Sequence, residues 1–173
     1  VPSNSNRLFL LALSILLCST ADLSASSPQL SIIMPRGIQR GVEHELTFVG
    51  NRLQDTEEVL FYQEGVTVLG IEVVDDKNVK VKVQVSADCE LGEHIAQLRT
   101  RSGISEFRSF FVGALPAVAE AEPNGALEEA QAIENNVTVT GIVTSEDVDL
   151  FKVAMGQGER LAVEVEALRL GTT

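Results

Sequence analysis

Apolar and polar residues alternate along most of this chain, and the alternation predicts β-strands. The clearest example is residues 78–85, where valines occupy every second position from Val79 to Val85. Successive side chains of a strand point to opposite faces, so these valines form one buried face. Similar patterns predict six more strands, at residues 30–34, 44–49, 58–62, 66–74, 93–100 and 105–112. Short turns rich in Gly, Asp and Asn separate them, which predicts an Ig-like antiparallel β-sandwich over residues 26–113.

The pattern changes after residue 113. Residues 114–125 contain two prolines and several alanines, and we expect a linker there. Residues 126–133 are compatible with one or two helical turns. Three further strands are predicted at residues 136–143, 149–155 and 159–168. Three strands cannot bury an apolar face alone, so we expect residues 126–173 to be an incomplete second β-sandwich, jelly-roll-like, within a longer protein.

The N-terminus has the features of an export signal. Arg7 precedes an apolar run of residues 8–17, which is too short to span a bilayer as a helix. Small residues around Ala21 then provide a cleavage site, so residues 1–25 are predicted to be a signal helix. Cys18 leaves a lipid anchor as an alternative, although Leu17 is large for the position before a lipidated cysteine. We therefore expect a secreted, periplasmic or cell-surface protein with no transmembrane segment after signal removal.

Charge narrows the range of partners. The formal net charge is -12 and the pI is near 4.5, so a nucleic acid would be repelled and is not expected as a partner. The acidic excess is concentrated after residue 114. Solubility of an exported protein explains this excess, and calcium or a basic protein surface would also fit it. Aromatic residues are only 5% of the chain, which leaves few platforms for stacking bases or sugars.

One acidic constellation is a candidate metal site. Glu120, Glu122 and Asn124 occupy alternate positions, which in an extended segment lie on one side. Asp147 and Asp149 precede a predicted strand and would complete the site if the segment folds back. Calcium takes six to eight oxygen ligands of this kind. The alternative is that Asn124 caps a short helix and that the two aspartates serve a turn and a strand edge.

Catalytic residues are not evident in the sequence. His44 and His94 fall on predicted strands, as surface or partly buried residues without a nucleophile motif nearby. Once the signal with Cys18 is removed, Cys89 would be the one remaining cysteine, which forms no internal disulfide, and we expect it to be a small buried apolar residue. The chain is therefore predicted not to be an enzyme.

Two family resemblances refine this interpretation. Pro35, Gly37 and Gly41, followed by the strand at residues 45–50 and a late Phe-Phe-Val at residues 110–112, resemble an IPT/TIG-type Ig-like domain. Such domains serve as spacers, adhesion modules or binding platforms.

The second part is similar to the start of a bacterial pre-peptidase C-terminal domain. The similarity lies in Glu-Ala-Glu-Pro-Asn at residues 120–124, Val-x-Val-x-Gly at 137–141, Glu-Asp-Val-Asp-Leu-Phe at 146–151 and the Gly-x-Gly turn before 159–166. The resemblance implies a β-sandwich appended to secreted proteases and other exported proteins, and related collagen-binding modules carry calcium near the same motifs. Gly125 departs from those relatives, which often have Asp there. The domain order resembles that of large exported proteins of planctomycete-type bacteria.

The sequence thus predicts a non-catalytic exported module for binding, adhesion or spacing, with a protein or polysaccharide surface as its partner. The alternative is an accessory N-terminal region of a secreted hydrolase, of the peptidase class, whose catalytic domain lies beyond residue 173.

Overall fold

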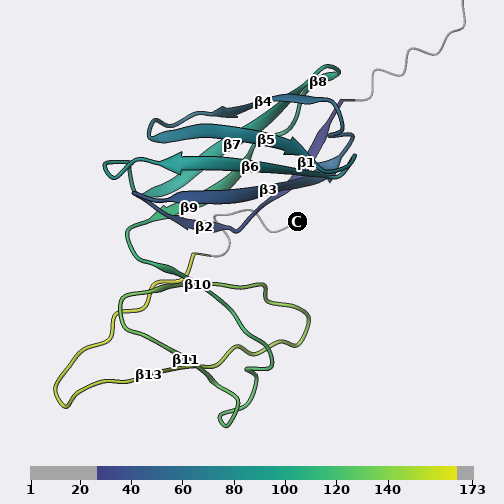
Figure 1. Ribbon diagram of the computed structural model, residues 1–173. Helices are drawn as coiled ribbons and strands as arrows, with labels where there is room; N and C mark the ends of the chain where they lie inside the picture. The colour runs from purple at the N-terminus through teal and green to yellow at the C-terminus, as the bar shows by residue number, and fades with distance from the viewer. Residues whose placement is uncertain (1–26, 167–173) are drawn as a thin grey trace, which may run out of the picture.

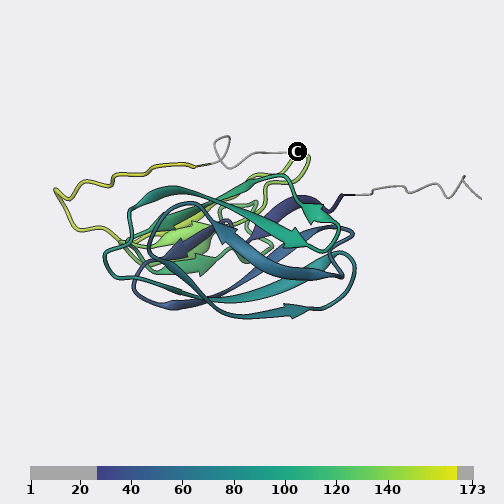
Figure 2. The same cartoon turned by 90° about the horizontal axis from the view of Figure 1, so that it is seen from above.

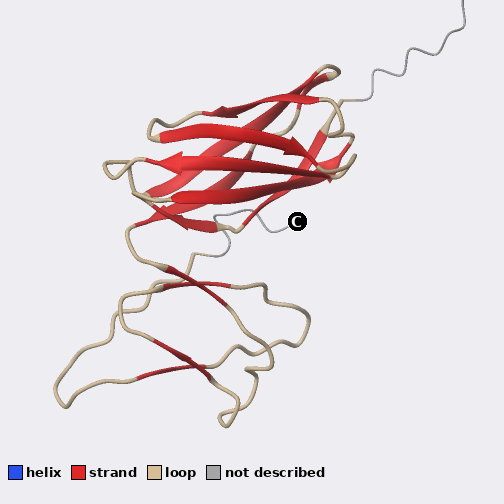
Figure 3. Ribbon diagram, in the orientation of Figure 1, coloured by secondary structure: helices blue, strands red, loops and turns tan. Residues whose placement is uncertain are grey.

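The computed structural model describes residues 27–166, and within that range the chain forms strands and loops without a helix (Figure 3). The all-β expectation is confirmed. In the described range there is accordingly no helix with the length and apolarity needed to cross a membrane. The predicted signal at residues 1–25, with Cys18, lies outside the described residues.

Two sheets form the first part of the chain, one in front of the other in Figure 1 and separated in the view from above in Figure 2. The first sheet is fully antiparallel. Its strands, in spatial order, are β1 (Gln29–Met34), β3 (Glu43–Asn51), β6 (Asn78–Val85) and β5 (Val66–Val73).

The second sheet contains β2 (Gly37–Gln39), β9 (Arg108–Gly113), β7 (Gly92–Thr100) and β4 (Thr56–Phe61), with β8 (Gly103–Ile104) paired to β7. The β2–β9 pair is parallel and the other pairs are antiparallel. The chain changes sheet between β1 and β2, at Pro35 and Arg36. Proline has no N–H to donate to a ladder, so it suits the place where one sheet's pairing ends.

The core lies between these sheets. The alternate valines of β6 are completely buried, as predicted, and face Phe110 and Leu98 from the opposite sheet. Phe110 also packs edge to face against Phe61, with ring centroids 5.9 Å apart. Burying a side chain of this size contributes about 1.5–3 kcal/mol. The predicted sandwich is confirmed, because the alternating pattern becomes one continuous apolar layer.

The second part of the chain contains two small parallel sheets. β10 (Ala117–Ala119) pairs with β12 (Thr138–Thr140), and β11 (Gln131–Ile133) pairs with β13 (Phe151–Val153). β10 lies within the segment that the sequence predicted to be a linker.

Two local predictions for this part are wrong. Instead of helical turns, residues 126–133 form a turn, closed by the Glu129 N–H donating to the Ala126 carbonyl, followed by β11. Residues 159–166 form no strand, although the sequence predicts one over residues 159–168. A tight turn precedes them, in which the Glu159 N–H donates to the Gly156 carbonyl.

The two parts of the chain touch where small residues allow it. A Cβ at Gly37 would lie 3.5 Å from Cγ2 of Thr140, and one at Gly113 would lie 3.6 Å from Oγ1 of Thr138. β12 therefore rests against the β2–β9 edge of the sandwich, and β10 lies below β2 in Figure 1. This contact positions the candidate site described next.

Candidate metal site and adjoining cleft

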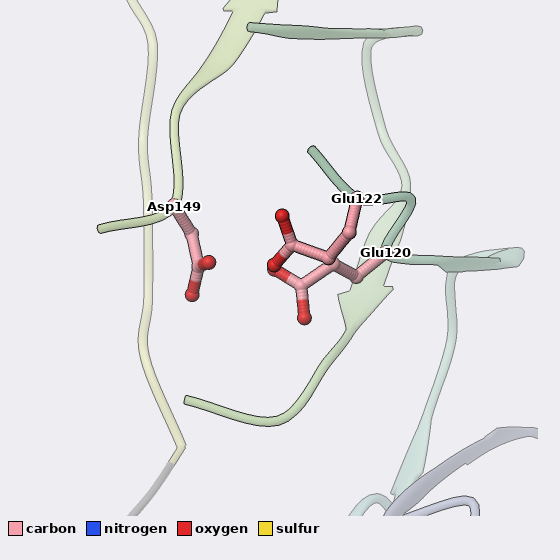
Figure 4. Close-up of side chains that lie close together, drawn as sticks. All are labelled: Glu120, Glu122 and Asp149. Carbon is pink, nitrogen blue, oxygen red and sulfur yellow. The ribbon is translucent and has the colours of Figure 1, made fainter. Parts of the chain in front are cut away.

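Three carboxylates meet in the second part of the chain. Glu120, Glu122 and Asp149 each offer an oxygen, and these three oxygens lie within 4.8 Å of one another. Figure 4 shows Glu120 and Glu122 extending from one segment toward Asp149, which lies on the segment that leads into β13. The cluster therefore joins two stretches of chain that are distant in sequence.

Backbone hydrogen bonds hold these stretches together. The Leu150 N–H donates to the Asn124 carbonyl at 3.1 Å, which places Asp149 beside the glutamates. The Glu120 N–H donates to the Thr140 carbonyl at 2.9 Å. Its side-chain Oε2 accepts from the Ile142 N–H at 3.0 Å. Glu120 is thereby fixed from both sides.

Asn124 lies against the cluster and is completely buried. Its side-chain Nδ2 donates to Oε1 of Glu120 at 3.1 Å, whereas its Oδ1 is buried without a hydrogen-bond partner. Oδ1 of Asp149 is likewise buried without a partner. Buried polar atoms are normally paired, so two unpaired oxygens beside two glutamates require an explanation. A cation supplies one.

The alternative role for Asn124, as a helix cap, is wrong. A capping side-chain oxygen accepts a hydrogen bond from an N–H two or three residues later. Oδ1 of Asn124 accepts none, and no helix follows it within the described chain.

The charge state of Asp149 reflects this crowding. Burial raises the pKa of its carboxyl, and a hydrogen bond to Glu120, which Asp149 can donate only when protonated, raises it further. The negative charges of Glu120, Asp147 and Glu122 act in the same direction. The site as it stands therefore disfavours its own full ionisation, a condition that a bound cation would reverse.

Asp147 does not join the group of three. Its Oδ2 accepts hydrogen bonds from the N–H and the hydroxyl of Thr144, both at 3.1 Å. These bonds lower the pKa of Asp147. They hold its side chain in a local turn. Asp147 therefore has the turn role that the sequence offered as the alternative to metal binding.

The remaining four residues suit a hard cation. Three carboxylates and one amide oxygen match the preference of calcium for oxygen ligands. No sulfur or imidazole ligand belongs to this group of residues, so the softer transition metals are less well matched. Counting one oxygen from each residue gives four, which is fewer than the six to eight that calcium takes. The prediction that these residues bind calcium stays a prediction.

A cleft of about 700 Å³ adjoins the cluster, between the sandwich and the second part of the chain. Glu120 and Glu122 belong to both the cluster and the wall of the cleft. The sandwich contributes Met34, Pro35, Arg36, Glu45 and Thr47, and the second part contributes Ala119, Ile142 and Asp147 among others. This cleft was not predicted from the sequence, since its walls come from segments that are distant along the chain.

Cys89 and His94 lie close together, contrary to the expectation that neither histidine has a nucleophile nearby. Sγ of Cys89 lies 3.9 Å from Nε2 of His94, and both residues are only 2% exposed. Nε2 lies 2.8 Å from the Glu90 carbonyl oxygen, so it carries the proton and donates it there. It is therefore not a base for the thiol, and burial raises the pKa of Cys89. The pair is a packing contact between the segment before β7 and β7 itself. His44 is engaged with the backbone of Gln39.

No protein-family model matches the chain, and no curated protein matches it. Among solved structures it is similar to SGBP-B of the Bacteroides ovatus mixed-linkage glucan utilization locus, in complex with a mixed-linkage heptasaccharide. That match has 16% identity and a TM-score of 0.38, and covers 62% of this chain and 25% of the other. It is also similar to a mutant of the SrpA adhesin from Streptococcus sanguinis, with 13% identity and a TM-score of 0.32, over 50% of this chain and 57% of the other. The chain thus spans about a quarter of the first structure and just over half of the second. The resemblances to IPT/TIG and pre-peptidase C-terminal domains stay predictions.

Proposed function

We propose that this chain is a non-catalytic, exported binding or adhesion module. In this proposal Glu120, Glu122, Asp149 and Asn124 hold a calcium ion. The observation that carries the site is the completely buried Asn124, whose Oδ1 has no partner beside three converging carboxylates.

The ion would stabilise the second part of the chain. Its two small sheets are three residues long in each strand, and isolated two-stranded pairs are only marginally stable in water. The ion would connect the segment after β10 to the segment before β13. It would also relieve the repulsion between carboxylates that adds to the effect of burial in raising the pKa of Asp149. An extracellular calcium module of this kind typically binds with a dissociation constant of roughly 0.1–1 mM.

The test compares two aspartates that are two positions apart. The full chain is stripped with EDTA, and thermal unfolding is followed with and without millimolar calcium, with magnesium as the ion control. Binding to the native state raises the melting temperature, so calcium should stabilise the wild-type chain. Asp149→Asn should abolish most of the calcium-induced increase, because it replaces a negatively charged carboxylate ligand by a neutral amide. Asp147→Asn keeps an oxygen that can accept from Thr144 but loses the negative charge that strengthens these bonds, so it should lower both melting temperatures while preserving the difference between them.

A melting temperature that does not respond to calcium would eliminate the metal site. An equal loss of the calcium response in both variants would show a nonspecific effect of acidic charge rather than coordination by Asp149.

A further inference from the structure

The proposed calcium site is incomplete when only protein ligands are counted. Its four residues supply four oxygens if each binds through one atom, and calcium takes six to eight. At least two positions must then be filled from outside the protein. Water fills such positions by default, and any ligand with two suitably spaced oxygens can replace it.

Two of the four proposed ligands also belong to the wall of the cleft. Glu120 and Glu122 line the cleft, whereas Asn124 and Asp149 do not. In Figure 4 the carboxylates of these two glutamates face that of Asp149, so an ion held among them would be bound to two residues of the cleft wall. The cleft volume of about 700 Å³ is within the range of roughly 300–1,000 Å³ found for ligand pockets, which often lie between domains.

The charges around the cleft are mostly negative. Glu45 and Asp147 are on its wall in addition to the two glutamates, and Arg36 is a basic residue of the same wall. Glu45 already pairs with Lys80 at 3.0 Å. An anionic ligand that approached the ion would meet these remaining carboxylates. A cationic ligand would meet the ion itself. A neutral ligand avoids both penalties.

The other wall residues suit a polyhydroxyl compound. Met34, Ala119 and Ile142 provide apolar surface for C–H groups, and Thr47 and Thr144 bring hydroxyls. Pockets that fix orientation with a few polar groups on an apolar wall are typical of small-ligand sites.

We propose that the cleft binds a neutral saccharide, with two adjacent sugar hydroxyls completing the coordination shell of the calcium ion at Glu120 and Glu122. This inference rests on the proposed calcium site. It names the ligand class of the module and predicts that saccharide binding requires calcium.

The experiment uses the full chain and two probes of similar size, mannotriose as the neutral saccharide and trigalacturonate as the acidic one. Isothermal titration calorimetry first measures calcium binding. Saturation-transfer NMR then detects each probe with calcium and with EDTA. Mannotriose should give a signal only with calcium, and trigalacturonate should give a weaker signal or none.

A pair of variants separates the cleft from the metal site. Thr47→Tyr introduces a large side chain into the cleft from β3, without changing any residue of the cluster. Thr67→Tyr places the same side chain at an exposed position of β5, which does not line the cleft. Thr47→Tyr should raise the dissociation constant of mannotriose, obtained by titrating the saturation-transfer signal, at least roughly tenfold with calcium affinity unchanged. A tenfold change corresponds to about 1.4 kcal/mol of saccharide binding. Thr67→Tyr should change neither mannotriose binding nor calcium affinity.

Four outcomes would overturn the inference while leaving the calcium site intact. They are calcium binding without a mannotriose signal, a mannotriose signal that persists in EDTA, stronger binding of trigalacturonate, and full mannotriose binding by Thr47→Tyr. An absence of calcium binding in the calorimeter would overturn the metal site and the inference together.

Discussion

Substitution of Asn124 by alanine separates the two explanations of its burial. Nδ2 donates to the charged Glu120, a bond worth about 1.5–3 kcal/mol, while Oδ1 is a buried unpaired acceptor that costs about 1–3 kcal/mol. Alanine removes both, so the contributions partly offset each other. We expect the free energy of unfolding of the calcium-free protein to fall by no more than about 2 kcal/mol.

With calcium present, the free energy of unfolding should differ between the wild-type chain and Asn124→Ala. At a calcium concentration one hundred times the dissociation constant, binding stabilises the native state by about 2.7 kcal/mol. If loss of the Asn124 oxygen weakens binding tenfold, this gain falls by about 1.3 kcal/mol. Urea unfolding measures this calcium-dependent gain in the free energy of unfolding. Circular dichroism is the signal, since the chain has no tryptophan for fluorescence. Asn135→Ala is the matched control, because the Asn135 side chain donates only to the Ala154 carbonyl at an exposed position.

Two results would refute this reasoning. An undiminished calcium gain in Asn124→Ala would show that the amide oxygen does not contact the ion. A loss above about 3 kcal/mol without calcium would show that Asn124 is chiefly a structural residue, since that loss exceeds the expected offset.

Three other predictions concern packing, reactivity and pH. Gly50→Ala should destabilise the sandwich by about 1–3 kcal/mol or more, because its Cβ would collide with a backbone carbonyl of β1, whereas Gly70→Ala meets no atom within 4 Å and should be nearly neutral by urea unfolding. In a Cys18→Ser background, Cys89 should react with a disulfide reagent on the order of a hundredfold more slowly in the folded chain than in urea, and comparable rates would show that it is accessible. The pKa of Asp149 is raised on folding, so the native state holds this proton more tightly than the unfolded chain does. The stability of the calcium-free protein should therefore fall as pH rises from about 3.9, the ordinary Asp value, through the raised folded pKa. Asp149→Asn should remove this fall in stability with rising pH. If the pH dependence of stability is unchanged in the variant, other groups cause it.

The sandwich was predictable because the alternation of apolar and polar residues marks its strands in the local sequence. The alternation in residues 78–85 matched β6 at both ends, since one face of that strand is buried and the other is wet. The segment at 126–133 was not predictable in this way. Its strand β11 forms by parallel pairing with β13, about twenty residues later in the chain. The local sequence of residues 126–133 does not indicate this pairing.

Residues 159–166 show how a turn can override an alternating pattern. The observed turn brings Gly156 opposite Glu159, so a continued hairpin would place Ala162 opposite Val153. Leu161 and Val163 would then point away from the face that holds Val153, because a one-residue change of register exchanges the faces of a strand. They are instead exposed outside any sheet in the described chain.

The candidate site was predictable in part, for a similar reason. The glutamates and Asn124 come from one short segment, so their proximity follows from spacing. Asp147 and Asp149 share that spacing, but Thr144 is three residues before Asp147 and captures its side chain locally. Cys89 and His94 flank Gly92, whose φ of 126° is a conformation that glycine adopts readily and that spacing along the chain does not encode.

The glycines at the junction have a consequence for how this molecule could be adjusted. At Gly37 and Gly113 there is room for a methyl group at ordinary van der Waals distance from Thr140 and Thr138, and little beyond it. Larger residues at either position would push the two parts of the chain apart, and the displacement would increase with the size of the side chain. The cleft could then be widened in steps by substitutions that leave every residue of its wall unchanged.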